Sequence, residues 1–146
     1  MVSPPDSVRT SFHRLPYLIY LISFSFILFL SMVLSPSAEG YGTHMQLGLP
    51  PCGFLTITGY PCPSCGITTS FSYFIRGDLF DSLRAQPFGF VLYAVLIAGF
   101  FISAYAVVKA IPVSYFLDSV IFERLQAVLL ILFLLSWFYK IYTLHT

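Results

Sequence analysis

The chain has 146 residues, of which 58% are hydrophobic, 18% aromatic and only 9% charged, with a formal net charge of +1. A soluble domain carries about a quarter charged residues, so this composition indicates a membrane protein and argues against a large soluble core. The near-neutral charge provides no basic patch, and we therefore expect no nucleic-acid partner.

The first predicted element is a membrane span. Residues 1–14 are polar, and we interpret them as a disordered, mildly basic tail. Residues 15–34 carry no charge, and about 20 apolar residues are enough to cross the hydrocarbon core of a bilayer. A cleaved signal peptide is the alternative, because basic residues come first. We favour an uncleaved anchor, because the apolar run is longer than the roughly 7–15 residues usual in a signal and Pro36 disfavours cleavage.

The next stretch is a loop that leads into a cysteine-containing hairpin. Residues 35–60 are rich in glycine and proline, which predicts a loop. We define the cysteine hairpin as residues 52–87, which contain all three cysteines of the chain. Because proline is favoured at the first helical position, Pro63 predicts a short helix with Cys62 at its N-cap. Apolar residues fall on one face of that helix, and Gly77 predicts its end. The residues of this apolar face are Ile67, Phe71, Phe74 and Ile75.

A second short helix is predicted after this glycine. Asp78 is a favourable N-cap residue for a helix over residues 79–86, and Asp81 resembles the partner residue of a capping box. Pro87 then opens the second span, residues 88–108, which again carry no charge. We therefore expect two short amphipathic helices that lie at the interface or enter the bilayer as a re-entrant segment.

The C-terminal part predicts a connection and a third span. Residues 110–124 carry apolar residues at helical spacing, which indicates a short interfacial helix. Residues 125–142 form the third apolar span, and residues 143–146 form a short tail. Aromatic and basic side chains at the end of this span are predicted to anchor it where the helix meets water. They are Trp137, Tyr139, Lys140 and Tyr142.

Together these elements predict an all-α integral membrane protein with a single membrane domain over residues 15–142. The positive-inside rule favours a cytoplasmic N-terminus, with four lysines and arginines on that side and three on the other. The cysteine hairpin would then lie on the outer face of a bacterial cytoplasmic membrane. We expect the lipid bilayer as a partner, together with a membrane protein or a second copy of the chain.

Three roles are open for the cysteines. Cys62 and Cys65 could form a redox pair, in which a helix N-terminus stabilises the Cys62 thiolate. Alternatively, they could bind zinc together with Cys52 and His44. In the third role the thiols are structural, as a static disulfide or as packed small residues. A single CxxC motif does not decide between these roles, so we expect no cofactor and keep zinc as the alternative.

The other candidate residues are structural or contact the membrane. Arg76 and Arg84 are candidates for contact with an anion or a lipid headgroup. Asp78 and Asp81 could act as an acid/base pair, but helix capping explains both, and we favour a protein that is not an enzyme. The remaining motif residues are expected to set the backbone of the hairpin. They are Pro63, Gly66, Thr68, Gly77, Asp78 and Pro87.

The hairpin resembles a known family. The segments 58–68, 77–79 and 85–87 are similar to the TG-x-P-CP-x-CG-x-TR, GD and NP elements of small bacterial membrane proteins catalogued as domain of unknown function 2752. The resemblance implies a multi-pass membrane protein with the motif between the first two spans, and it implies no established activity. Cys52 also resembles an upstream cysteine of that family.

Two positions depart from the family pattern. Thr69 stands where the family usually has arginine, and Gln86 stands where it usually has asparagine. If the missing arginine holds an anion or a carboxylate, Arg76 is a candidate to replace it. We expect an accessory or scaffold protein whose hairpin organises a site for a partner or ligand. The alternative is a thiol-redox or zinc-binding membrane protein that uses Cys62 and Cys65.

Overall fold

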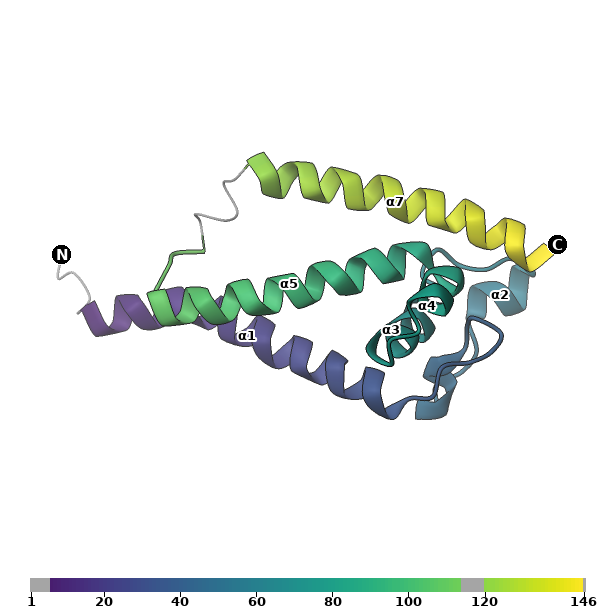
Figure 1. Ribbon diagram of the computed structural model, residues 1–146, viewed down its shortest axis with the longest axis horizontal. Coiled ribbons are helices and arrows are strands. Elements are labelled where there is room, and N and C mark those ends of the chain that lie inside the picture. Colours follow the sequence, from purple (N-terminus) through teal and green to yellow (C-terminus); the bar gives the residue numbers. More distant parts are fainter. Residues whose placement is uncertain (1–5, 114–119, 146) are drawn as a thin grey trace.

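The computed structural model describes residues 6–113 and 120–145, and within these ranges all regular structure is helical (Figure 1). Its elements are α1 (Asp6–Val33), the 3₁₀ helix η1 (Thr43–Leu47), α2 (Gly53–Thr58), α3 (Ile67–Ile75), α4 (Leu79–Ala85), α5 (Pro87–Lys109) and α7 (Val120–His145). Three helices are long and apolar enough to cross a membrane, over Arg14–Val33, Pro87–Lys109 and Val120–Thr143. The predicted fold class is therefore confirmed.

Two helix boundaries differ from the sequence prediction. α1 begins at Asp6, so most of the segment predicted to be a disordered tail is helical. The reason is that no helix breaker follows Asp6 until Pro16, and extending an existing helix costs much less than nucleating one. α7 begins at Val120 rather than at residue 125. The predicted interfacial helix within residues 110–124 includes residues 114–119, which lie outside the described residues.

The first two spans, α1 and α5, run in opposite directions and pack against each other (Figure 1). Tyr20 of α1 donates a hydrogen bond to the Leu96 carbonyl of α5 over 2.8 Å. A Cβ atom on Gly99 would lie 2.6 Å from the Tyr20 hydroxyl oxygen, so the glycine makes room for this contact. A small residue at the crossing lets two membrane helices approach closely.

The helix α3 packs against both α1 and α5 at the end of the molecule that holds the cysteine hairpin. Phe71 of α3 stacks 4.5 Å, between ring centroids, from Tyr93 of α5, which in turn contacts Phe24 of α1. The other apolar residues predicted for this face of α3 pack against the same cluster. They are Ile67, Phe74 and Ile75. The predicted helical face is therefore confirmed, and it joins the hairpin to the first two spans.

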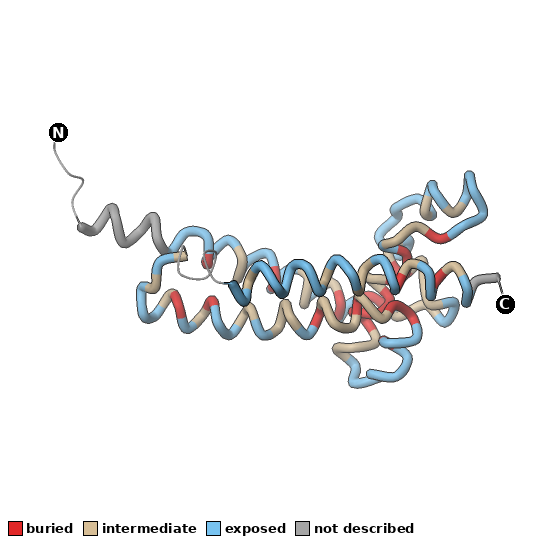
Figure 2. The backbone as a smooth tube through the Cα atoms, turned by 90° about the horizontal axis from the view of Figure 1, so that it is seen from above, coloured by how far each residue is buried: buried red, intermediate tan, exposed pale blue. Residues whose placement is uncertain are grey.

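Serine side chains hold α3 against α4. The Ser70 and Ser82 hydroxyl oxygens lie 2.9 Å apart, and the Ser82 hydroxyl also donates to the Ser70 carbonyl over 2.8 Å. Both side chains are fully buried. Figure 2 shows many of the buried residues near this end, whereas few residues of the long helices are buried. Exposed apolar helices and a buried polar end fit a protein whose sides face lipid.

Candidate functional site

The three cysteines lie between the first two membrane spans in the sequence, and they come together beside the start of α3. The sulfur atoms of Cys52, Cys62 and Cys65 all lie within 4.8 Å of one another. All three are free thiols, with Cys65 buried and the other two half-buried. Zinc binds thiolate sulfur at about 2.3 Å, so sulfur atoms around one such ion lie roughly 4 Å apart. We call these three residues the thiol cluster.

The backbone that carries two of these thiols is a pair of turns and not the start of a helix. The Cys65 amide donates to the Cys62 carbonyl over 3.0 Å, and the Ile67 amide donates to the Ser64 carbonyl over 3.2 Å. α3 begins only after Gly66, whose φ of +96° is favourable for glycine alone. The predicted N-cap position of Cys62 is therefore wrong, because a proline suits the second position of a turn as well as the first turn of a helix.

The surroundings make two of the thiols chemically different. Burial, together with the charges of the neighbouring Cys62 and Cys52, raises the pKa of the Cys65 thiol to about 12. Burial also raises the pKa of Cys52, but hydrogen bonds from the backbone of Leu55 and Phe54 and from the other thiols outweigh it, and the pKa falls below its ordinary value. Of these two thiols, Cys52 loses its proton first as the pH rises.

Side chains from two membrane helices hold the turns of the motif in place. The Trp137 indole of α7 donates to the Pro61 carbonyl over 2.9 Å. The Gln86 amide, at the start of α5, donates to the Pro63 carbonyl over 2.9 Å, and its oxygen accepts a hydrogen bond from Ser136 of α7 over 3.0 Å. Gln86 is fully buried. The residue that departs from the family pattern therefore links the motif to the third span.

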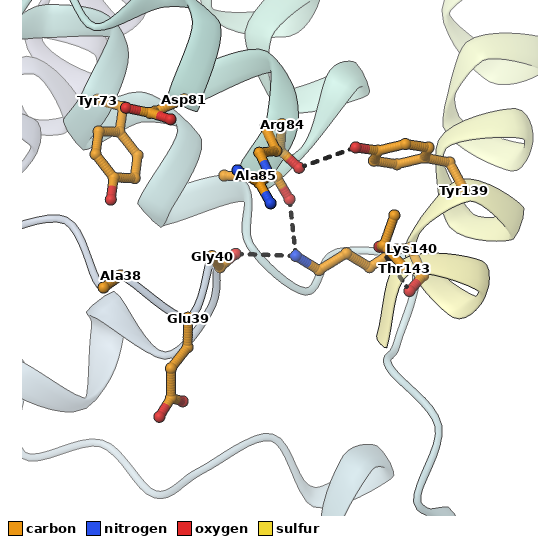
Figure 3. A pocket seen from close by; sticks show the side chains of 10 residues that line it. All are labelled: Ala38, Glu39, Gly40, Tyr73, Asp81, Arg84, Ala85, Tyr139, Lys140 and Thr143. Carbon is orange, nitrogen blue, oxygen red and sulfur yellow. Dashed lines mark hydrogen bonds between the residues drawn. The ribbon is translucent and has the colours of Figure 1, made fainter. Parts of the chain in front are cut away.

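Lys140 of α7 is a site residue that was not predicted as one. It was predicted to anchor the helix in water at the membrane boundary, but only 3% of its surface is exposed, so that prediction is wrong. Its ammonium donates to the carbonyls of Gly40 (3.1 Å) and Ala85 (2.9 Å), as Figure 3 shows. A Cβ atom on Gly66 would lie 3.5 Å from the Lys140 nitrogen, which places this cation beside the motif.

A sequence signal for Lys140 was present. Ser136 and Lys140 are one helical turn apart in the mostly apolar stretch of residues 127–142, so they share a face. An ionisable residue in a membrane helix is a candidate functional residue by default. No ion pair to a carboxylate is formed by Lys140 within residues 14–113 and 120–143, so backbone carbonyls provide its main hydrogen-bond acceptors.

His44 and Arg76 are placed away from the thiol cluster. The His44 ring lies 3.3 Å from the Pro50 carbonyl oxygen, and it does not join the three thiols in the group that could hold a metal ion. The Arg76 guanidinium donates to the carbonyls of Ser31 (3.0 Å) and Met32 (3.0 Å) at the end of α1, and also to that of Ser72. Arg76 therefore satisfies carbonyls that the end of a helix leaves without partners.

The position where the family usually has arginine is filled by a buried hydroxyl pair. Thr69 is fully buried, and its hydroxyl lies 2.8 Å from that of Thr43 in η1. The Thr43 oxygen also accepts a hydrogen bond from the Ser37 amide over 3.0 Å. This pair joins the loop after α1 to the hairpin without any charge.

The remaining motif residues lie at turns and helix ends. Gly77 has a φ of +85° between α3 and α4, and Pro87 occupies the first turn of α5. Asp78 is at the N-cap of α4, but its side chain makes no capping hydrogen bond. Thr68 is partly buried on α3. Arg84, the second predicted anion or lipid contact, lines a cavity between α4 and α7.

Comparisons with known proteins bear on the hairpin and the helix that follows it. No curated protein and no solved structure matches the chain. The model of the family described as "Protein of unknown function (DUF2752)" matches residues 52–100, about a third of the chain, which confirms the family resemblance predicted from the cysteine motif.

Proposed function

We propose that this membrane protein is a binding protein whose cysteine hairpin organises a site for one thiophilic divalent metal ion, such as Zn²⁺. The observation that carries the proposal is the approach of three free thiols to within 4.8 Å of one another. Cys52, at the start of α2, and the two cysteines of the turns before α3 therefore offer three sulfur ligands at one point. Thiolate sulfur is a preferred ligand of zinc and other soft metal ions.

The charge of the surroundings supports a divalent ion. Each thiol gives up a proton when it binds a metal, so three thiolates and one divalent ion carry a net charge of −1. Lys140 is a buried cation beside the motif, because a Cβ atom on Gly66 would lie 3.5 Å from its nitrogen. A buried charge is costly unless an opposite charge compensates it. A bound metal with three thiolates would supply that compensation.

Three protein ligands leave the fourth position of a tetrahedral ion open. An open position is typical of metal sites at which a water molecule, substrate or partner ligand binds. This arrangement suits an accessory protein that presents a metal ion to a second protein in the same membrane. With the predicted orientation, in which the N-terminus is cytoplasmic, the site would face the outside of the cell.

The test is the metal content of the full chain purified in detergent. We expect about one zinc per chain, and we expect each of the variants Cys52→Ser, Cys62→Ser and Cys65→Ser to lose most of it. Thr58→Ser is the control, because Thr58 is exposed in the same hairpin, its hydroxyl contacts none of the thiols, and the change keeps all three cysteines. A wild-type chain without metal, or cysteine variants that keep it at full occupancy while folded, would contradict the proposal.

A second candidate function is thiol–disulfide exchange, and the lowered pKa of Cys52 favours it. In this scheme the Cys52 thiolate attacks a disulfide of a partner protein and releases one partner thiolate. Cys62 then attacks the mixed disulfide, which leaves a Cys52–Cys62 disulfide and a partner with two thiols. Acid trapping followed by alkylation separates the candidates. Two oxidised thiols per chain support exchange, whereas three thiols protected until a chelator is added support a metal site.

A further inference from the structure

A polar cavity of about 470 Å³ lies between α4, α7 and the loop that follows α1 (Figure 3). Its volume falls in the range of about 300–1,000 Å³ that small-molecule sites occupy. Charged and phenolic side chains dominate its lining. They are Glu39, Tyr73, Asp81, Arg84, Tyr139 and Lys140. Lys140 lines both this cavity and the region beside the motif. None of the three thiols lines the cavity, and neither do the residues that hold the motif in place, which are Gln86, Ser136 and Trp137.

The cavity presents unpaired charges of both signs. Asp81 and Arg84 lie on α4, and neither forms an ion pair with any residue that the structure describes. The Tyr139 hydroxyl donates to the backbone carbonyl of Arg84 over 3.5 Å, and the Arg84 side chain is exposed where it lines the cavity. A ligand that carries an anionic group and a cationic group would satisfy both side chains. Arginine is well suited to phosphate, because its planar donors match two phosphate oxygens.

The position of the cavity along the membrane helices indicates where such a ligand comes from. The residues of α7 that line it lie at the last turns of a span that ends at Thr143. On α4, Leu79, Phe80 and Leu83 are exposed, with 76% of the Phe80 surface accessible. A short helix with one apolar exposed face and charges on another is typical of the membrane interface. The cavity therefore lies at the depth of lipid headgroups.

We propose that this cavity binds the headgroup of an aminophospholipid such as phosphatidylethanolamine. Arg84 binds the phosphate, and Asp81 accepts hydrogen bonds from the primary ammonium group. Phosphatidylcholine has a quaternary ammonium that cannot donate such bonds, and phosphatidylglycerol has no cation. Arg84 and Asp81 do not belong to the thiol cluster, so substituting them tests headgroup recognition without removing a proposed metal ligand.

The experiment is native mass spectrometry of the full chain, released from detergent after exchange into equal amounts of the three lipids. We expect phosphatidylethanolamine to be retained about fivefold more than either of the other lipids, and we expect Arg84→Gln and Asp81→Asn each to remove most of this preference. Arg124→Gln and Glu123→Gln are matched controls, because they make the same chemical changes at exposed positions near the start of α7.

Several results would overturn the proposal. Equal retention of the three lipids by the wild-type chain would do so, as would a preference that survives in folded Arg84→Gln and Asp81→Asn variants. Thermal unfolding in detergent establishes that these variants are folded, and both side chains are exposed, so we expect little change in stability. Free phosphoethanolamine that binds as tightly as the lipid would also contradict it, because the ligand would then be a soluble zwitterion.

Discussion

Replacing Lys140 with methionine tests how strongly the third span holds the cysteine motif. The ammonium donates two hydrogen bonds, to the Gly40 and Ala85 carbonyls, and both would be lost. A hydrogen bond to a charged group contributes about 1.5–3 kcal/mol, so the pair contributes roughly 3–6 kcal/mol. Removing the buried charge offsets part of this loss. We expect the free energy needed to open the turns around Cys65 to fall by about 3 kcal/mol.

The assay is the rate at which a thiol reagent modifies Cys65 in the metal-free protein. Cys65 is buried, so it reacts only when the surrounding turns open. A loss of about 3 kcal/mol in the opening free energy raises the population of the open form, and therefore the rate, about a hundredfold. Lys109→Met is the control, because Lys109 is exposed at the far end of α5. A Cys65 modification rate that stays within about threefold of wild type would refute this reasoning.

Three further predictions follow from the geometry. Gly66→Ala should destabilise the protein by about 2–5 kcal/mol in thermal unfolding, because Gly66 has a positive φ and a Cβ atom there would lie 2.6 Å from a carbonyl oxygen. Gly59 also has a positive φ but would have no such clash, so Gly59→Ala should cost about 1–2 kcal/mol in the same assay. The pKa of Cys65 is raised to about 12 in the folded protein, whereas an unfolded cysteine has a pKa of about 8.5. The neutral Cys65 thiol therefore stabilises the metal-free protein fully below about pH 8.5, and this stabilisation falls as the pH rises toward 12. In Cys65→Ala, the free energy of unfolding measured across that range should lose this pH dependence. A double-mutant cycle of Thr43→Val and Thr69→Val should give a coupling energy of about 1 kcal/mol, and additive effects would argue against their hydrogen bond.

Much of the architecture could be predicted because its signals are local. Uncharged runs of spanning length predict the three membrane helices, and apolar residues at helical spacing predict the buried face of α3. Gly77 and Pro87 lie where the backbone needs a positive φ and a preset first helical turn. Each of these inferences depends on residues within a few positions of one another.

The site was harder to predict because its contacts join distant parts of the chain. Lys140 contacts a carbonyl of Gly40, 100 residues away, and no local pattern specifies which carbonyls a lysine will reach. The Cys62 position was predicted wrongly because Pro63 is equally compatible with a turn and with a helix start. The approach of Cys52 to the other thiols depends on a loop whose path only the fold determines.

The measurement that tests the central claim most directly is X-ray absorption at the zinc edge on the purified full chain. If the thiol cluster binds the metal, the first shell should contain three sulfur atoms at about 2.3 Å from zinc, together with one lighter ligand. A first shell made only of nitrogen and oxygen atoms, or one with fewer than three sulfur atoms, would contradict the assignment of the thiol cluster as the metal site.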